Sequence, residues 1–258
     1  MMQTIDFPLS ELEAMKKYPD ALYAKGDLTL LDRPKVSIVG TRRPSAYTRQ
    51  YTHEVARALS RRGVCIVSGA AMGVDAIAHQ GAGADNTIAV MANSLDIRYP
   101  SVNRALIEEI EKRGLTLSQF DPNFKATAWS FVLRNEIVVA LGEFLIVTEA
   151  ALDSGSMRSV EYALKMEKKI YVLPHHLGES EGTNHLLKEG MAEPIYDIEA
   201  FASRFGQAVD DTVRKDDFFY FCQKSPTLDE ALASFGERVY EAELEGMIGV
   251  KNGLIYWL

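Results

Sequence analysis

Cysteine is scarce in this sequence, with Cys65 and Cys222 as the only two among 258 residues. Because they stand in unrelated contexts, we expect neither a disulfide framework nor a cysteine-based metal site. No run of about 18 apolar residues occurs, which argues against a membrane-spanning helix. The first residues carry acids where a signal peptide would carry a basic stretch followed by an apolar one. The sequence therefore favours a cytoplasmic protein.

Positive charge is also in deficit, because 28 Lys+Arg stand against 36 Asp+Glu and the formal net charge is −8. This balance argues against attraction of nucleic acid over the whole surface. The balance does not exclude a local binding site for nucleic acid, since residues 33–53 hold basic side chains and no acidic one. They are Arg33, Lys35, Arg42, Arg43 and Arg49. Hydrophobic residues at 47% and charged residues at 25% exclude a disordered chain. We expect a globular protein with a local basic patch, unless these arginines simply pair with surface acids.

Apolar runs alternate with helical patterns from residue 35 to residue 205. The runs are continuous, which is typical of strands buried on both faces of a parallel sheet. They lie at 36–39, 64–67, 87–91, 115–117, 144–147 and 170–173. We predict an α/β fold, a Rossmann-like doubly wound and mostly parallel sheet with helices on both faces. Residues 1–34 are too short to hold a core and are predicted to pack on this domain as a lead-in.

The C-terminal segment follows a different pattern. Residues 206–214 are predicted to be a linker, and residues 215–258 a small winged-helix-like domain. Three short helical patterns precede a hairpin with Asn252-Gly253 in its turn, the strongest two-residue hairpin signal. The third pattern, 236–247, carries four acidic residues and one arginine. Since a helix that reads duplex DNA should be basic, we expect this domain to contact protein.

Loops that contain glycine or serine follow three of the predicted strands, where ligands bind in sheets of this kind. Their candidate site residues are Gly40, Thr41, Arg42 and Arg43; Ser68, Gly69 and Gly73; and Ser154, Gly155 and Ser156. The first loop lacks the second glycine of a dinucleotide-binding fingerprint. Free backbone N–H groups at a helix N-terminus favour anions, so the loops are candidate phosphate sites. Helix capping is the simpler alternative for Asp75 and for Ser154 or Ser156.

Aromatic and basic side chains are interleaved in residues 121–136, which we interpret as a loop. Phe124, Trp129 and Phe131 stand among Lys125, Arg134 and Asn135. Single-stranded nucleic acid needs this combination, because bases stack on the rings while cations follow the backbone. The alternative is that the rings anchor the core.

Five segments, in this order and spacing, resemble the DNA-processing protein A family, DprA, also called Smf. They are SIVGTRRPSAY, SGAAMGVDAIAH, TIAVMANSLDIRYPSVN, FVLRNEIVVAL and SGSMRSVEYAL. The resemblance covers about residues 18–201, and the tail more weakly resembles the small domain of many members. It implies a single-stranded DNA-binding protein of natural transformation and competence, which protects incoming DNA and loads the RecA recombinase. It also implies a homodimer without a cofactor or an established catalytic activity.

The family's DNA pocket corresponds to the three loops above together with Phe131, Arg134 and Asn135. Three positions depart from the family pattern: Gln119 and His175 replace Glu and Gly, and Glu136 replaces Arg. We expect Glu136 to weaken the positive charge of the pocket or to pair with Arg134. Lys125 is then the candidate for supplying the missing charge.

An enzyme on the same architecture is the competing hypothesis. The chain resembles, more distantly, the phosphoribohydrolases that activate cytokinins, whose PGGxGTxxE loop carries a catalytic glutamate. Glu161 has that glutamate's spacing, but Gly155 alone matches among the proline and glycines of the loop. A helix-surface or capping role for Glu161 is simpler, so we expect a binding protein and not a nucleoside-monophosphate phosphoribohydrolase.

Overall fold

The computed structural model of the protein describes residues 2–207, 217–244, 246–251 and 253–257. The chain divides into two compact units, 1–208 and 209–258, which we describe separately. Most of the expected linker at 206–214, and the first two residues of the expected C-terminal domain, lie outside the described residues.

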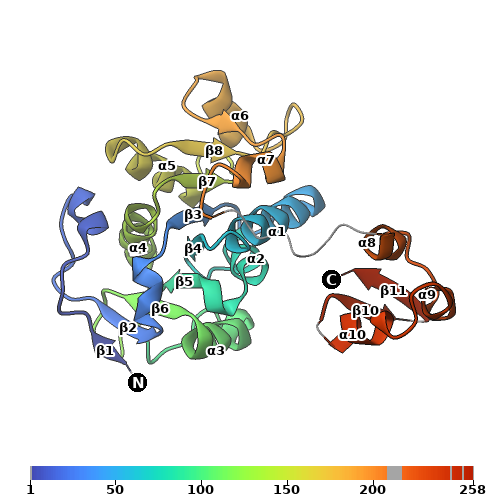
Figure 1. The fold of residues 1–258 in the computed structure, drawn as a ribbon. Helices are drawn as coiled ribbons and strands as arrows, with labels where there is room; N and C mark the ends of the chain where they lie inside the picture. Colours follow the sequence, from blue (N-terminus) through green and yellow to red (C-terminus); the bar gives the residue numbers. More distant parts are fainter. Residues whose placement is uncertain (1, 208–216, 245, 252, 258) are drawn as a thin grey trace. The chain divides into compact units, whose positions relative to one another are not determined.

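The first unit is built on a nine-stranded sheet (Figure 1). The strands are β1 (Gln3–Thr4), β2 (Tyr23–Gly26), β3 (Lys35–Val39), β4 (Cys65–Ser68), β5 (Thr87–Val90), β6 (Leu115–Ser118), β7 (Leu145–Val147), β8 (Ile170–Val172) and β9 (Glu193–Pro194). Their order is β1-β2-β6-β5-β4-β3-β7-β8-β9. Strands β6 through β9 in this order are parallel, and β2 and β1 extend the sheet as antiparallel strands. The predicted Rossmann-like, mostly parallel fold is confirmed.

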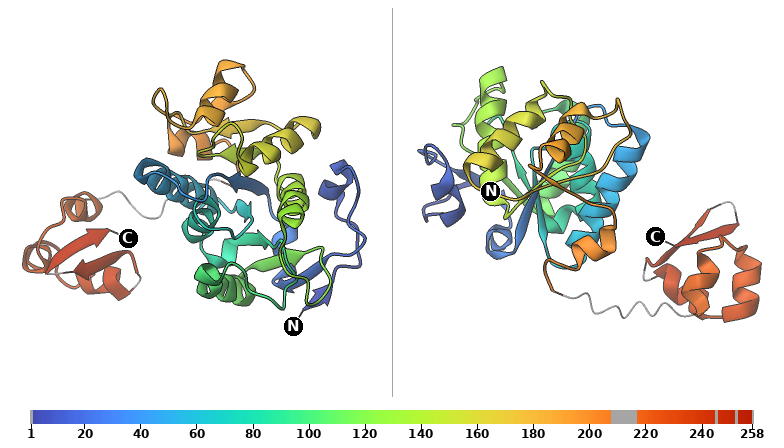
Figure 2. Two further views of the ribbon diagram at one scale, coloured as in Figure 1. Left: turned by 180° about the vertical axis from the view of Figure 1, so that it is seen from behind. Right: turned by 90° about the horizontal axis from the view of Figure 1, so that it is seen from above.

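Helices cover both faces of the sheet, as Figures 1 and 2 show. They are α1 (Ala46–Ser60), α2 (Val74–Ala82), α3 (Arg104–Arg113), α4 (Ala128–Leu141), α5 (Gly155–Lys165), α6 (Glu181–Lys188) and α7 (Ile198–Ala202). Helices α4, α5 and α6 pack with Val39, Val67 and Val147 in one apolar cluster, and α1, α2 and α7 pack with Ile38 and Ile66 in another. Successive strand residues therefore face opposite helix layers, which explains why the strands read as continuous apolar runs.

Strand β3 lies where the winding of the sheet reverses. The chain proceeds from β3 through β4 and β5 to β6 on one side, then returns to place β7 on the other side of β3. The loops that follow β3 and β7 therefore diverge above the sheet. Ligands of doubly wound folds bind at this switch point, outside the carboxyl ends of the strands.

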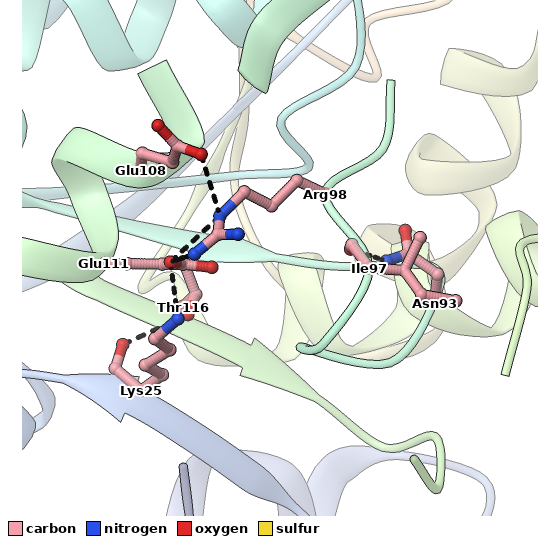
Figure 3. Close-up of polar contacts among 7 residues, drawn as sticks. All are labelled: Lys25, Asn93, Ile97, Arg98, Glu108, Glu111 and Thr116. Atoms are coloured by element: carbon pink, nitrogen blue, oxygen red, sulfur yellow. Dashed lines mark hydrogen bonds and ion pairs between the residues drawn. The ribbon is translucent and has the colours of Figure 1, made fainter. Parts of the chain in front are cut away.

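The N-terminal residues pack on the edge of the sheet and on α4. A 3-10 helix (Ser10–Ala14) places Glu11 2.7 Å from the ammonium of Lys35, and β2 pairs with β6. Glu111 of α3 accepts from Lys25 of β2 at 2.6 Å and from Arg98 at 2.7 Å (Figure 3). This ion cluster fixes β2, α3 and the loop after β5 to one another.

In its described residues, the second unit contains three helices and a hairpin. They are α8 (Asp217–Cys222), α9 (Leu228–Phe235), α10 (Arg238–Leu244), β10 (Ile248–Lys251) and β11 (Leu254–Trp257), with β10 and β11 antiparallel. Thr227 and Glu230 form a capping box at the start of α9, and Gly236, at φ +57°, follows its end. Phe218, Cys222, Val239 and Ile255 are buried in the small core. The expected order of three helices followed by a hairpin is confirmed.

Candidate nucleic-acid interface

A hollow of about 680 Å³ opens at the carboxyl ends of β3 and β7, and we call it the strand-end hollow. Its lining includes Gly40, Thr41, Arg42, Asp75, Ala128, Phe131, Val132, Arg134, Asn135, Ser154, Gly155, Ser156, Arg158 and Ser159. These residues come from the loops after β3 and β7 and from α2, α4 and α5. The first and third predicted loops and the Phe131-Arg134-Asn135 motif thus meet at one place. The second loop contributes Ala71 to the lining, and its predicted residues Ser68, Gly69 and Gly73 do not line the hollow.

Glycines of the first two loops are needed where the loops pack on each other. A Cβ atom on Gly40 would lie 2.7 Å from Cγ2 of Val74, and one on Gly73 would lie 2.4 Å from the carbonyl oxygen of Thr41. Gly73 also has φ +81°, which favours glycine. Val74 N–H donates to the Thr41 carbonyl at 3.1 Å across this contact. Gly40 lines the hollow, and Gly73 supports the loop that carries it.

Arg42 is exposed, and its guanidinium carbon lies 5.1 Å from the centroid of the Phe131 ring. That ring is half-buried, and Tyr99 lies 6.2 Å from it at a tilt of 54°. A guanidinium held over an aromatic face keeps its hydrogen-bond donors free at the rim, where a phosphate can reach them. Arg43 is also exposed but does not line the hollow.

Arg134 is buried, with 4% of its surface exposed, and it holds the loop after β4. Its Nη1 donates to the carbonyls of Gly69 and Val90, and its Nε donates to Asn135 Oδ1 at 3.2 Å. A Cβ atom on Gly69 would overlap the guanidinium, so this glycine is required by the close approach of Arg134. Burial lowers the pKa of Arg134, and the nearby Asp75 carboxylate opposes that shift.

Asp75 is not the helix cap that the sequence suggested. Gly73 occupies the N-cap position of α2, and Asp75 lies in the first turn with its side chain buried. Burial raises the pKa of Asp75, while the charge of Arg134 and the backbone N–H groups of Ala71 and Gly69 oppose the shift. Arg134 and Asp75 are therefore oppositely charged, buried neighbours in the wall of the hollow, and the charge of each opposes the effect of burial on the pKa of the other.

His79 continues this polar network into the core. Its Nε2 accepts from Ala70 N–H at 3.3 Å, and its Nδ1 lies 2.6 Å from Thr87 Oγ1. Because the Thr87 hydroxyl donates to the Ile66 carbonyl, Nδ1 must carry the proton, so the ring is neutral. Burial, reinforced by the charge of Arg134, lowers the pKa of His79 to about 3.

This histidine should make the first unit sensitive to acid. Below its ordinary pKa of 6.5 the unfolded chain binds a proton that the folded chain refuses, so stability falls as the pH drops toward 3. The slope from this side chain approaches about 1.4 kcal/mol per pH unit. We expect His79→Gln to flatten the pH dependence of the unfolding free energy, measured by urea titration between pH 7 and pH 4. The exposed His185→Gln variant is the control, and an equal slope in wild type and His79→Gln would refute the assignment.

The N-terminus of α5 forms the opposite wall. Ser154 is its N-cap but makes no capping hydrogen bond, and the buried hydroxyls of Ser154 and Ser159 have no partner among the described residues. The first N–H groups of a helix also lack intrahelical partners, and together these donors favour an anion. Arg158, which sequence reasoning missed, lies one turn along α5 and lines the hollow. Residues four apart lie on the same face of a helix, so the spacing between Ser154 and Arg158 could have indicated that both face the hollow.

The prediction of a loop over residues 121–136 is wrong for its second half, because α4 begins at Ala128. Thr127 and Ser130 form a capping box, with Ser130 Oγ accepting from Thr127 N–H at 2.9 Å. Phe131, Arg134 and Asn135 thus stand on a rigid helix instead of a loop.

Other expected site residues lie away from the hollow. Ser68 is fully buried and its hydroxyl donates to the Ile38 carbonyl at 2.7 Å, and Lys125 is exposed but does not line the hollow. Glu136 does not pair with Arg134 as expected, because its carboxylate accepts from Lys16 N–H at 2.9 Å in the N-terminal segment. It does not line the hollow.

The two remaining departures from the family pattern, His175 and Gln119, lie outside the lining of the hollow. His175 Nε2 donates to the Thr148 carbonyl at 2.7 Å and its ring packs edge-on to Tyr47. The amide nitrogen of Gln119 is buried without a partner among the described residues. Neither residue lines the hollow.

Glu161, the candidate of the enzyme hypothesis, is a surface residue of α5. Its carboxylate pairs with Arg158 at 3.0 Å, and half of its side chain is exposed. It does not line the hollow. Across the described residues, no group of three or more His, Cys, Asp or Glu side chains could hold a metal ion. In the same part of the chain, no helix has the length and apolar character needed to cross a membrane.

Comparison with known proteins gives one consistent family. Residues 1–206 match the family model described as DNA recombination-mediator protein A. The DNA processing protein DprA of Bacillus subtilis is 34% identical over 193 residues, which are 73% of this chain and 65% of that protein. The Streptococcus pneumoniae protein of the same name is 35% identical over 70% of this chain and 65% of its own length. Protein Smf of Escherichia coli is 34% identical over 72% of this chain and 51% of its own length. The chain thus spans about half to two thirds of the length of these relatives.

Two solved structures share the fold at substantial identity. DNA processing protein A from Helicobacter pylori, in a structure described by its single-stranded DNA binding mode, has a TM-score of 0.77 and 43% identity. The match covers 79% of this chain and 94% of that one. DprA from Streptococcus pneumoniae has a TM-score of 0.74 and 32% identity, with 79% and 74% of the two chains covered. These findings do not favour the phosphoribohydrolase hypothesis.

Proposed function

Since this chain belongs to the DNA recombination-mediator protein A family, we propose that it binds single-stranded DNA in the strand-end hollow. The observation that carries this proposal is the convergence of Arg42, the N-terminus of α5 and the Phe131 ring on one hollow at the switch point of the sheet. The name of the Helicobacter pylori structure, which refers to single-stranded DNA, supports the same substrate.

The phosphate and the base of a nucleotide each have a matching group in the hollow. Arg42 and the free N–H groups of α5 bind phosphates, and Phe131 offers part of a ring to a base. Arg134 acts mainly through the loop that it holds, because its Nη1 donates to the carbonyl groups of Gly69 and Val90. Stacked and paired bases of a duplex cannot reach a half-buried ring, so single strands bind preferentially.

The wider role that we propose rests on the resemblance to the family. The protein protects incoming single strands and loads the RecA recombinase onto them during natural transformation, in the cytoplasm and as a homodimer. Two hollows on one dimer engage one strand twice, which raises its apparent affinity. The second unit contacts protein instead of duplex DNA, because residues 207–258 hold five basic and ten acidic side chains. Neither step requires a covalent reaction by this chain.

The proposal is tested by fluorescence anisotropy with a labelled oligonucleotide and with its duplex, each across a salt series. We expect tighter binding of the single strand, with log K falling against log salt by about 0.7 for each phosphate neutralised. Equal affinity for both forms, or binding that is insensitive to salt, would contradict the proposal.

Gly155 offers a way to separate DNA binding from folding. A Cβ atom on this residue would meet nothing within 4 Å, and helices favour alanine over glycine, so Gly155→Ala should fold at least as stably as wild type. The added methyl group would project where a phosphate approaches the N-terminus of α5. We therefore expect weaker binding of single-stranded DNA with an unchanged or higher Tm. Unchanged affinity would remove this helix end from the DNA site.

A further inference from the structure

Trp129 is a large apolar side chain that the fold leaves exposed. It lies in the first turn of α4, and 53% of its surface is accessible. Its helix neighbours Ala128 and Val132 line the strand-end hollow, whereas Trp129 itself does not. The indole therefore stands just outside the rim.

The indole is held in a defined orientation by two phenyl rings. Phe120 and Phe124 are stacked, with centroids 4.4 Å apart and planes at 11°. Trp129 lies 5.7 Å from Phe120 and 5.6 Å from Phe124, with interplanar angles of 76° and 69°. These nearly equal distances place the indole beside both phenyl rings, with one of its faces against their edges. Its other face then points away from the phenyl rings, and 53% of the residue's surface is accessible.

Phe131 does not offer an equivalent surface. Its ring is half-buried and has the guanidinium of Arg42 at 5.1 Å and that of Arg134 at 5.8 Å. A base can reach only the part of this ring that the two cations leave uncovered. The larger free aromatic face at this end of the sheet belongs to Trp129, and the exposed Lys125 lies four residues before it in the chain.

We propose that Trp129 is a second base-stacking platform, which binds a nucleotide of the same strand immediately outside the strand-end hollow. The inference rests on the proposed function, and it concerns the path of the strand beyond the hollow. Three observations favour a base over a protein partner: the platform is continuous with the hollow through Ala128 and Val132, a single flat ring is held rigidly, and a cation is near in sequence. Stacking on an exposed ring tolerates any base sequence.

Tryptophan fluorescence reports on this contact directly, because a stacked base quenches an indole. Trp129 and Trp257 are the two tryptophans of the chain, so Trp257→Phe leaves Trp129 as the sole emitter. If that change disturbs the second unit, the difference between wild type and Trp129→Phe gives the same signal. We expect oligothymidines of increasing length to quench Trp129 only once they exceed the length that fills the hollow. Binding without quenching at any length would overturn the proposal.

Affinity provides the second readout. We expect Trp129→Ala to weaken binding of long oligothymidines by about 5- to 150-fold, while the shortest ones that bind are little affected. Trp129→Phe retains a ring and should recover much of the loss. Tyr196→Ala removes another exposed aromatic side chain, after β9, and is the matched control.

The outcomes distinguish this inference from the proposed function. If Arg42 is needed for binding but Trp129→Ala has no effect at any length, the platform is wrong and the hollow stands. If Trp129→Ala changes the molar mass measured by light scattering and leaves DNA affinity unchanged, the ring contacts protein and the proposal fails. If no single-stranded DNA is bound by wild type, the proposed function itself is wrong.

Discussion

Replacing Arg42 with alanine should weaken binding of single-stranded DNA by about 10- to 100-fold, the range expected for a lost hydrogen bond to a charged group. Arg42 is the exposed cation of the strand-end hollow that lies over the Phe131 ring. Its removal takes away a phosphate partner, so the salt dependence of log K should also become shallower by about 0.7. Both quantities come from anisotropy titrations at several salt concentrations.

Arg43→Ala is the matched control for this experiment. Arg43 is the next residue in the same loop, carries the same charge and is exposed, but does not line the hollow. We expect a much smaller change in affinity than for Arg42→Ala. Equal losses from the two variants would mean that the loop contributes general positive charge, and the assignment of Arg42 to the hollow would fail.

Arg134→Met should destabilise the first unit by about 3–5 kcal/mol, the usual cost of removing one partner from a buried pair of charges. The substitution leaves the carbonyls of Gly69 and Val90 without their donor and leaves Asp75 buried without its nearby cation. A loss of this size is a large part of the roughly 5–15 kcal/mol by which domains are stable. Urea denaturation followed by circular dichroism measures it.

A double variant identifies the cause of this loss. In the Arg134→Met background, Asp75→Asn removes the uncompensated charge and should restore part of the stability. Arg158→Met, on the exposed surface of α5, should change stability by less than about 0.5 kcal/mol. If Arg134→Met unfolds at the same urea concentration as wild type, Arg134 is not the support of the loop after β4.

The sheet was predictable because its strands are buried on both faces. The runs at 36–39 and 64–67 are apolar at nearly every position, and each ends in small residues, so both the strand and the position of the following loop can be read from sequence. The meeting of these loops at one end of the sheet then follows from parallel pairing. The start of α4 was missed because Thr127 and Ser130 form a capping box without the usual Glu or Gln.

Side-chain direction was harder to predict than backbone position. Arg134 and Glu136 are the first and third residues of the family motif, and residues two apart on a helix do not face each other. Arg134 accordingly points to the carbonyls of Gly69 and Val90, and Glu136 points to Lys16 on the other side. A motif read as a loop gives no such direction. The same limitation concealed Arg158, which faces the hollow from the second turn of α5.

The most direct test of the central claim is to locate bound DNA by photocrosslinking. An oligothymidine carrying 5-iododeoxyuridine is irradiated with the full chain, and the crosslinked peptides are identified by mass spectrometry after trypsin digestion. We expect crosslinks in residues 126–134, which contain the rings of Trp129 and Phe131, and expect Arg42→Ala to reduce their yield. Crosslinks confined to residues 217–257, or a yield in 126–134 that Arg42→Ala leaves unchanged, would contradict binding of single-stranded DNA in the strand-end hollow.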